Sequence, residues 1–189
     1  MKNKKTSIYQ ITFMALMAAV ICILAPNSIQ IGVIPITLTN LVVYFSVYVL
    51  GMWAGTGSYV IYMLLGIVGL PVFSGYAGGL GKVVGPTGGY IVGFIFMALI
   101  GGFVMEKTNR KLIPTMLAWV VGTAVDYALG TVWFVYTAHC SVNYALSVCV
   151  YPFIVFDLIK IVLGTVVGRE VHKALCKAGI LAFTDKAKA

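Results

Sequence analysis

The chain has 189 residues, of which 61% are hydrophobic and only 10% are charged, and its formal net charge is +8. Because soluble domains contain roughly 45–50% apolar residues, this composition excludes an ordinary soluble protein and indicates an integral membrane protein. The apolar segments are continuous and do not alternate with polar residues, which excludes a transmembrane barrel and favours one all-α domain over residues 1–189.

The chain length allows about six transmembrane helices, since each crossing takes roughly 20 residues. We expect these spans near residues 8–25, 40–52, 57–70, 87–105, 113–136 and 146–168. The first follows a basic head, as in a secretory signal, but lacks a clear cleavage site, so we expect it to be retained. Gly55 and Gly57 in MWAGTGS predict a tight turn between spans two and three. Pro86 is expected in the first turn of span four.

The basic residues predict how the helices are oriented. They cluster before the first span, in the loop at 107–111 and after the last span, whereas Lys82 lies alone in a loop of the other side. By the positive-inside rule, this distribution places both termini in the cytoplasm and requires an even number of spans. We therefore attribute the positive charge to topology and expect no nucleic-acid partner.

Motifs for nucleotide binding and catalysis fail on their own spacing. Gly81 and Lys82 lack the preceding glycine and the following Ser or Thr of a P-loop, so any ATP hydrolysis must come from another chain. The four cysteines form no CxxC pair, and we interpret them as small core residues, with a Cys140–Cys149 bridge as the alternative. We expect no enzymatic activity, no cofactor and no bound metal.

Three charged residues fall inside predicted spans. Asp157 and Lys160 lie three residues apart in IVFDLIKIVLG and therefore share one face of a helix, and Asp126 lies in the fifth span. Charges within a membrane are costly and indicate a functional site. A purely structural pairing of Asp157 with Lys160 is the alternative. For Asp126 we favour a structural role, either neutralising Lys160 or bonding to a neighbouring helix.

The segment GLPVFSGYAGGLGKVVGPTGGYIVGF holds many of the 21 glycines of the chain. Such a backbone lies at membrane depth only where protein buries it or where it lines a cavity. Within it, GLPVFSGYAGG and GPTGGYIVGF, followed by the DLIK of the last span, resemble in order and spacing the BioY family, the biotin-specific S components of energy-coupling factor (ECF) transporters. The resemblance covers nearly the whole chain.

That resemblance implies a six-helix bundle in the bacterial cell membrane. Proteins of this family capture biotin from outside and deliver it with a transmembrane coupling subunit and two ATPase subunits. An S component for another vitamin and a stand-alone channel or facilitator remain the alternative functions. Span one carries small residues four apart, which permit close helix approach. An alanine motif on this helix meets the coupling subunit in the family, which implies that role for Ala15 and Ala19, with packing inside the chain as the alternative.

The chemistry of biotin suggests which polar residues bind it. Biotin has a ureido group at one end and a carboxylate at the other, so its site needs an acceptor, donors and a cation. We expect Asp157 to accept from the ureido N–H groups and Lys160 to pair with the carboxylate. Asn143 or loop amides are expected to donate to the ureido oxygen.

Further contacts are expected from the glycine-rich segment and the first outer loop. The backbone of Gly88 and Gly89 permits close approach of a ligand at the start of a helix, where free N–H groups favour an anion. Aromatic walls and loop contacts complete the predicted site, and the candidates are Tyr90, Trp53, Thr37 and Thr39.

Overall fold

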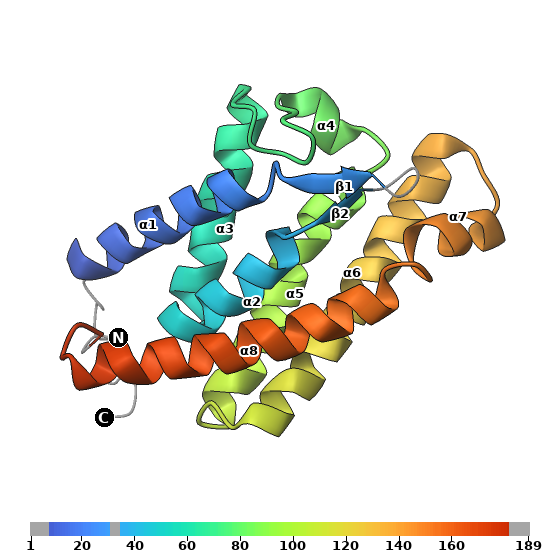
Figure 1. The fold of residues 1–189 in the computed structure, drawn as a ribbon. Helices are drawn as coiled ribbons and strands as arrows, with labels where there is room; N and C mark the ends of the chain where they lie inside the picture. The colour runs from blue at the N-terminus through green and yellow to red at the C-terminus, as the bar shows by residue number, and fades with distance from the viewer. Residues whose placement is uncertain (1–7, 31–34, 182–189) are drawn as a thin grey trace, which may run out of the picture.

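The computed structural model of the chain describes residues 8–30 and 35–181. These residues form eight helices and two short strands (Figure 1). In chain order they are α1 (Ile8–Leu24), β1 (Ser28–Gln30), β2 (Pro35–Thr37), α2 (Thr39–Leu50), α3 (Met52–Val68), α4 (Leu80–Val84), α5 (Gly88–Lys107), α6 (Leu112–Ala138), α7 (Val142–Cys149) and α8 (Ile154–Lys177). The predicted helical character is confirmed.

The segment after the first helix differs from the loop that we predicted. Strands β1 and β2 pair as an antiparallel hairpin in which Ser28 lies opposite Thr37 and Ile29 lies opposite Ile36. β-Branched residues favour this extended pairing. The hairpin leads directly into α2, so it holds Thr37 above the start of that helix.

The reversal between α2 and α3 lies at Gly51 and not within MWAGTGS, which is helical throughout. Gly51 has a φ of 90°, a conformation that is accessible to glycine at little cost. The role of Gly55 is close packing, because a Cβ atom there would lie 2.3 Å from the Cα of Val47. The turn prediction failed because glycine permits either a turn or a close helix contact, and the sequence does not distinguish them.

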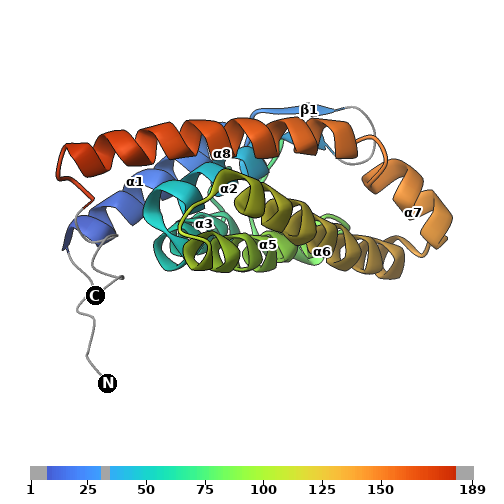
Figure 2. The same cartoon turned by 90° about the horizontal axis from the view of Figure 1, so that it is seen from below.

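The helices pack around a centre of large aromatic side chains. Helix α5 packs along α6, and α8 packs along α2 (Figure 2). Tyr44 and Trp119 are fully buried between these layers, with ring centroids 4.9 Å apart. Gly101 makes room for this centre, because a Cβ atom there would lie 2.1 Å from the indole of Trp119. The centre therefore depends on a large residue of one helix facing a glycine of another.

Two further boundaries differ from the prediction. Helix α5 begins at Gly88 with Thr87 as its N-cap residue, so Pro86 precedes the helix and does not lie in its first turn. The predicted last span at 146–168 is interrupted, since α7 ends at Cys149 and α8 begins at Ile154. The axes of α7 and α8 differ by 47°.

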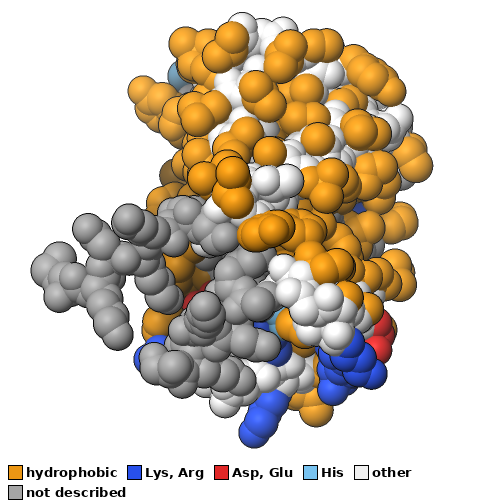
Figure 3. Space-filling view, turned by 90° about the vertical axis from the view of Figure 1, so that its left-hand side faces the viewer, with side chains coloured by type: hydrophobic (Ala, Val, Ile, Leu, Met, Phe, Trp, Pro, Cys, Tyr) orange, Lys and Arg blue, Asp and Glu red, His pale blue; other side chains and the backbone are white. Residues whose placement is uncertain are grey.

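Within the described residues, α5 and α6 are each long and apolar enough to cross a membrane. The bent pair of α7 and α8 passes the same test when the two are taken together, which gives up to three spans, and α1, α2 and α3 are shorter apolar helices. Hydrophobic side chains cover much of the face that includes α1, while Lys and Arg gather at one end of it (Figure 3). This surface suits a lipid environment with one polar end.

Candidate functional site

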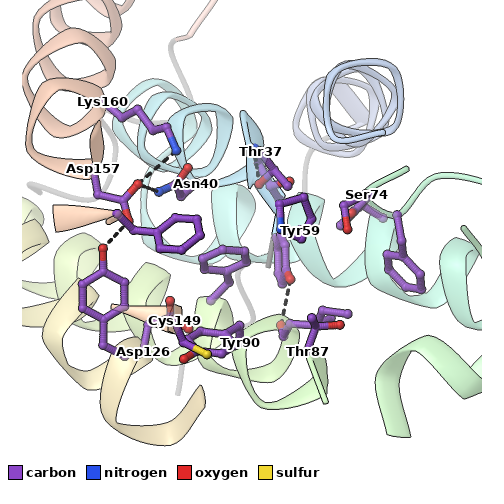
Figure 4. Close-up of a pocket in the computed structure, with 18 residues that line it drawn as sticks. Thr37, Asn40, Tyr59, Ser74, Thr87, Tyr90, Asp126, Cys149, Asp157 and Lys160 are labelled. Carbon is purple, nitrogen blue, oxygen red and sulfur yellow. Dashed lines mark hydrogen bonds and ion pairs between the residues drawn. The ribbon is translucent and has the colours of Figure 1, made fainter. Parts of the chain in front are cut away.

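One cavity lies between the hairpin and helices α2, α3, α5, α6, α7 and α8 (Figure 4). The volume of the cavity is about 90 Å³. Pockets for small molecules commonly combine apolar walls with a few polar groups. The composition of the cavity lining therefore suits a small ligand that has both apolar and polar parts.

An ion pair forms the most polar part of the cavity. The Nζ atom of Lys160 lies 3.0 Å from Oδ1 of Asp157, and both side chains are nearly inaccessible to solvent. The same Oδ1 accepts a hydrogen bond of 2.7 Å from Nδ2 of Asn40, and Oδ2 accepts one from the hydroxyl of Tyr127. The carboxylate of Asp157 therefore accepts three hydrogen bonds, one each from residues of α2, α6 and α8. These bonds offset the cost of burying its charge.

Aromatic side chains form a rigid wall of the cavity. Tyr59 is fully buried and donates from its hydroxyl to the carbonyl of Ile91 at 2.7 Å. Its ring meets Phe94 edge to face at 5.8 Å between centroids, and Tyr62 meets Phe73 in the same way at 5.6 Å. Such contacts fix ring orientations, so the wall is preorganised for an apolar ring system.

A second carboxyl group lines the cavity apart from the ion pair. Asp126 is 2% exposed, and its Oδ1 has no hydrogen-bond partner within the described part of the chain. Buried polar atoms without partners are rare in folded proteins. The sequence suggested that Asp126 neutralises Lys160 or bonds to a neighbouring helix, whereas the cation is bound to Asp157 and the facing position on α5 is Gly93.

Five of the predicted site residues meet at this cavity. Asp157 and Lys160 contribute from α8, Tyr90 from α5, and Thr37 and Thr39 from the hairpin end and the start of α2. The hydroxyl of Tyr90 lies 3.3 Å from that of Thr131. Residues separated by more than 100 positions in the sequence are thus brought to one site.

Other predicted residues lie elsewhere. Asn143 is exposed on α7 and does not line the cavity, and Trp53 is 72% exposed at the start of α3. Gly88 and Gly89 are buried against protein: a Cβ atom at Gly88 would lie 1.6 Å from the carbonyl oxygen of Val83, and one at Gly89 would lie 2.3 Å from Trp133. Their close approach is to α4 and α6, while the flanking Thr87 and Tyr90 reach the cavity.

The alanines predicted to contact a partner face outward on α1. Ala15 and Ala19 are exposed, whereas Ala18 is 2% exposed and packs inside the chain. Of the small residues on α1, Ala15 and Ala19 therefore face outward, whereas Ala18 faces the interior of the chain. The outward face is available to a lipid or to another protein.

Several cavity residues were missed by sequence reasoning. Asn40 was not among the candidates, although it lies in the first turn of α2 and bonds to Asp157 from 117 positions away. Tyr127 directly follows Asp126, and this adjacency was an available signal for its role. Cys149 also lines the cavity, and all four cysteines are free thiols, so the alternative of a Cys140–Cys149 bridge is not formed.

The comparisons with known proteins agree on one family. The model of the BioY family matches residues 1–177. The biotin transporter BioY2 of Lactococcus lactis is 33% identical over 172 residues, which cover 91% of this chain and 94% of the relative. The biotin transporter BioY of Thermotoga maritima is 39% identical over 155 residues, or 82% and 90% of the two chains.

The fold agrees with a solved structure as well. The crystal structure of the S-component for biotin from an ECF-type ABC transporter matches with a TM-score of 0.81 and 29% sequence identity. The match covers 92% of this chain and 95% of the other. This chain belongs to the BioY family.

Proposed function

We propose that this chain is the biotin-binding S component of an ECF-type vitamin uptake transporter. The observation that carries the proposal is a cavity that joins a buried Lys160–Asp157 pair to an aromatic wall, in a chain whose relatives are biotin transporters. The proposed role is capture and delivery of a vitamin without chemical change. The chain is proposed to act as a single domain in the bacterial cell membrane, with a coupling subunit and two ATPase subunits as partners.

Lys160 is proposed to bind the carboxylate of biotin. An ammonium group has three N–H donors, and within the described residues Asp157 takes one of them, which leaves two for a ligand. The sequence suggested that Asp157 holds the ureido end while Lys160 holds the carboxylate. Because these two groups lie 3.0 Å apart, they cannot hold opposite ends of an extended ligand, and we assign both to the carboxylate end. Asp157 then acts as the residue that positions Lys160.

We expect purified protein to contain biotin or to bind it tightly. Mass spectrometry of the small molecules released on denaturation identifies what co-purifies, and equilibrium binding of labelled biotin measures the affinity. A different vitamin in the released fraction would support the alternative S component. Conduction through liposomes without a bound ligand would support the channel instead.

Six spans with both termini in the cytoplasm are proposed for the topology. Arg110, in the connection between α5 and α6, donates from its guanidinium to the carbonyl of Tyr48 near the end of α2. In the basic part of α8, Nδ1 of His172 lies 2.9 Å from the carbonyl oxygen of Val49. These contacts gather two basic segments at one end of the bundle, as the positive-inside rule requires of a cytoplasmic face. Helix α4, which carries Lys82, lies toward the other end (Figure 1).

Labelling from the two sides of the membrane tests this topology. Single cysteines at Lys82 and Lys107, in a variant without the four native cysteines, are treated in intact cells with a reagent that does not cross the membrane. We expect Lys82→Cys to react from outside and Lys107→Cys to react only after the cells are opened. Reaction of both from the same side would contradict the six-span arrangement.

A further inference from the structure

Asp126 is a polar group that the protein places in the cavity and leaves without a partner. Its side chain is almost fully buried, lines the cavity from α6 and has an unpaired Oδ1 within the described chain. A Cβ atom on Gly93 would lie 2.1 Å from this oxygen, so α5 leaves room for the carboxyl group by having no side chain there. Figure 4 shows Asp126 near Cys149 and Tyr90 and away from Asn40 and Lys160.

The charges around Asp126 favour its neutral form. The titratable groups that approach it or share its cavity from other helices are those of Tyr44, Tyr59, Tyr62, Tyr90, Cys149, Asp157 and Lys160. Phenols and thiols are neutral near pH 7. Among the described residues that line the cavity, Lys160 is the only cation, and it is bound to Asp157. An ionised Asp126 would be a buried charge without a counter-ion, and a bound ligand carboxylate would add to the excess of negative charge.

We infer that Asp126 is a carboxylic acid that holds the ureido group of biotin through two hydrogen bonds. Its O–H donates to the ureido oxygen, and its C=O accepts from the neighbouring ureido N–H. A urea presents these two groups side by side, and a carboxylic acid presents the complementary pair. The inference rests on the proposed function and orients the ligand, with the ureido group at Asp126 and the carboxylate at Lys160.

Substitutions at Asp126 separate this role from its alternatives. Asn also presents a donor and an acceptor, so we expect Asp126→Asn to bind biotin within about threefold of wild type. Asp126→Leu has a similar size but neither group, and we expect roughly 10- to 100-fold weaker binding. Affinities are measured by equilibrium binding in detergent, and thermal unfolding without ligand checks that each variant is folded. Asp126→Ala takes the place of the Leu variant if that one is unstable.

Ligand and pH add two independent readouts. Biotin methylated on one ureido nitrogen should bind wild type more weakly than biotin does, and the Leu or Ala variant should discriminate less. Between about pH 6 and pH 9, where biotin stays ionised, the neutral acid predicts that wild-type affinity stays level or falls as the pH rises. The affinity of Asp126→Asn should stay level over the same range.

Three results would overturn the inference. Equal loss of binding in the Asn and Leu variants, or an affinity that increases with pH, would identify the ionised carboxylate as the acceptor. Unchanged biotin affinity in the Leu or Ala variant would show that Asp126 has only a structural role, while the proposed function stands. Failure of the folded wild type to bind biotin would instead overturn the proposed function and this inference with it.

Discussion

Lys160→Ala should abolish the preference of the protein for biotin over its uncharged amide. In wild type the amide leaves the buried ammonium without the charge of the ligand carboxylate, so biotin should bind more tightly. A hydrogen bond to a charged group contributes about 1.5–3 kcal/mol, which corresponds to roughly tenfold to over a hundredfold in affinity. The Ala variant should lose this factor for biotin and bind both ligands about equally. Competition binding with the two ligands measures the preference directly.

Two variants serve as controls for this experiment. Lys173 also lies three residues after an acid in α8 and is 2.8 Å from Glu170, but both side chains are exposed. We expect Lys173→Ala to leave both affinities unchanged, because solvated ion pairs contribute little. Asp157→Asn should weaken the binding of biotin, because Lys160 is positioned less well, but the preference for biotin over the amide should persist since Lys160 keeps its charge. If Lys160→Ala keeps the full preference, another donor such as Asn40 binds the carboxylate and Lys160 only neutralises Asp157.

Replacing Ala15 and Ala19 together by Trp should block biotin uptake while leaving biotin binding intact. Both residues are exposed on α1, and small side chains at this spacing let a second helix approach closely. We propose that this helix belongs to the coupling subunit. Two indole rings would hold the helices apart, so the complex should fail to assemble. Co-purification of the coupling subunit and uptake of labelled biotin by cells containing all subunits measure the effect.

A matched variant controls for bulky residues at the lipid surface. Leu117 and Val121 are also four positions apart and are 61% and 56% exposed on α6. Replacing both by Trp should leave assembly and uptake near the wild-type level. Loss of biotin binding in the Ala15 and Ala19 variant would point to packing within the chain. Unchanged uptake in that variant would show that another surface meets the partner.

The composition and local spacing of the sequence determined the class of the protein and the most polar part of its site. A continuously apolar chain in a membrane must satisfy its backbone hydrogen bonds internally, which selects helices. Residues three apart on a helix share a face, so the spacing of Asp157 and Lys160 in the sequence predicted that their side chains lie close together. In the structure, Nζ of Lys160 lies 3.0 Å from Oδ1 of Asp157. The glycine-rich motifs, together with the DLIK of the last span, were enough to indicate the family.

Tertiary packing decided which other residues share the cavity. Asn40 bonds to Asp157 across 117 positions, and no local period relates the two. Asn143 was chosen for its side-chain chemistry, but α7 holds it outside the cavity. The role of each glycine could not be predicted for the same reason. At Gly88 and Gly89 the missing Cβ leaves room for neighbouring helices, whereas at Gly93 it leaves room for the carboxyl group of Asp126. The chemistry of a side chain is written in the sequence, but its neighbours depend on which helix faces pack together, and only the folded structure specifies that.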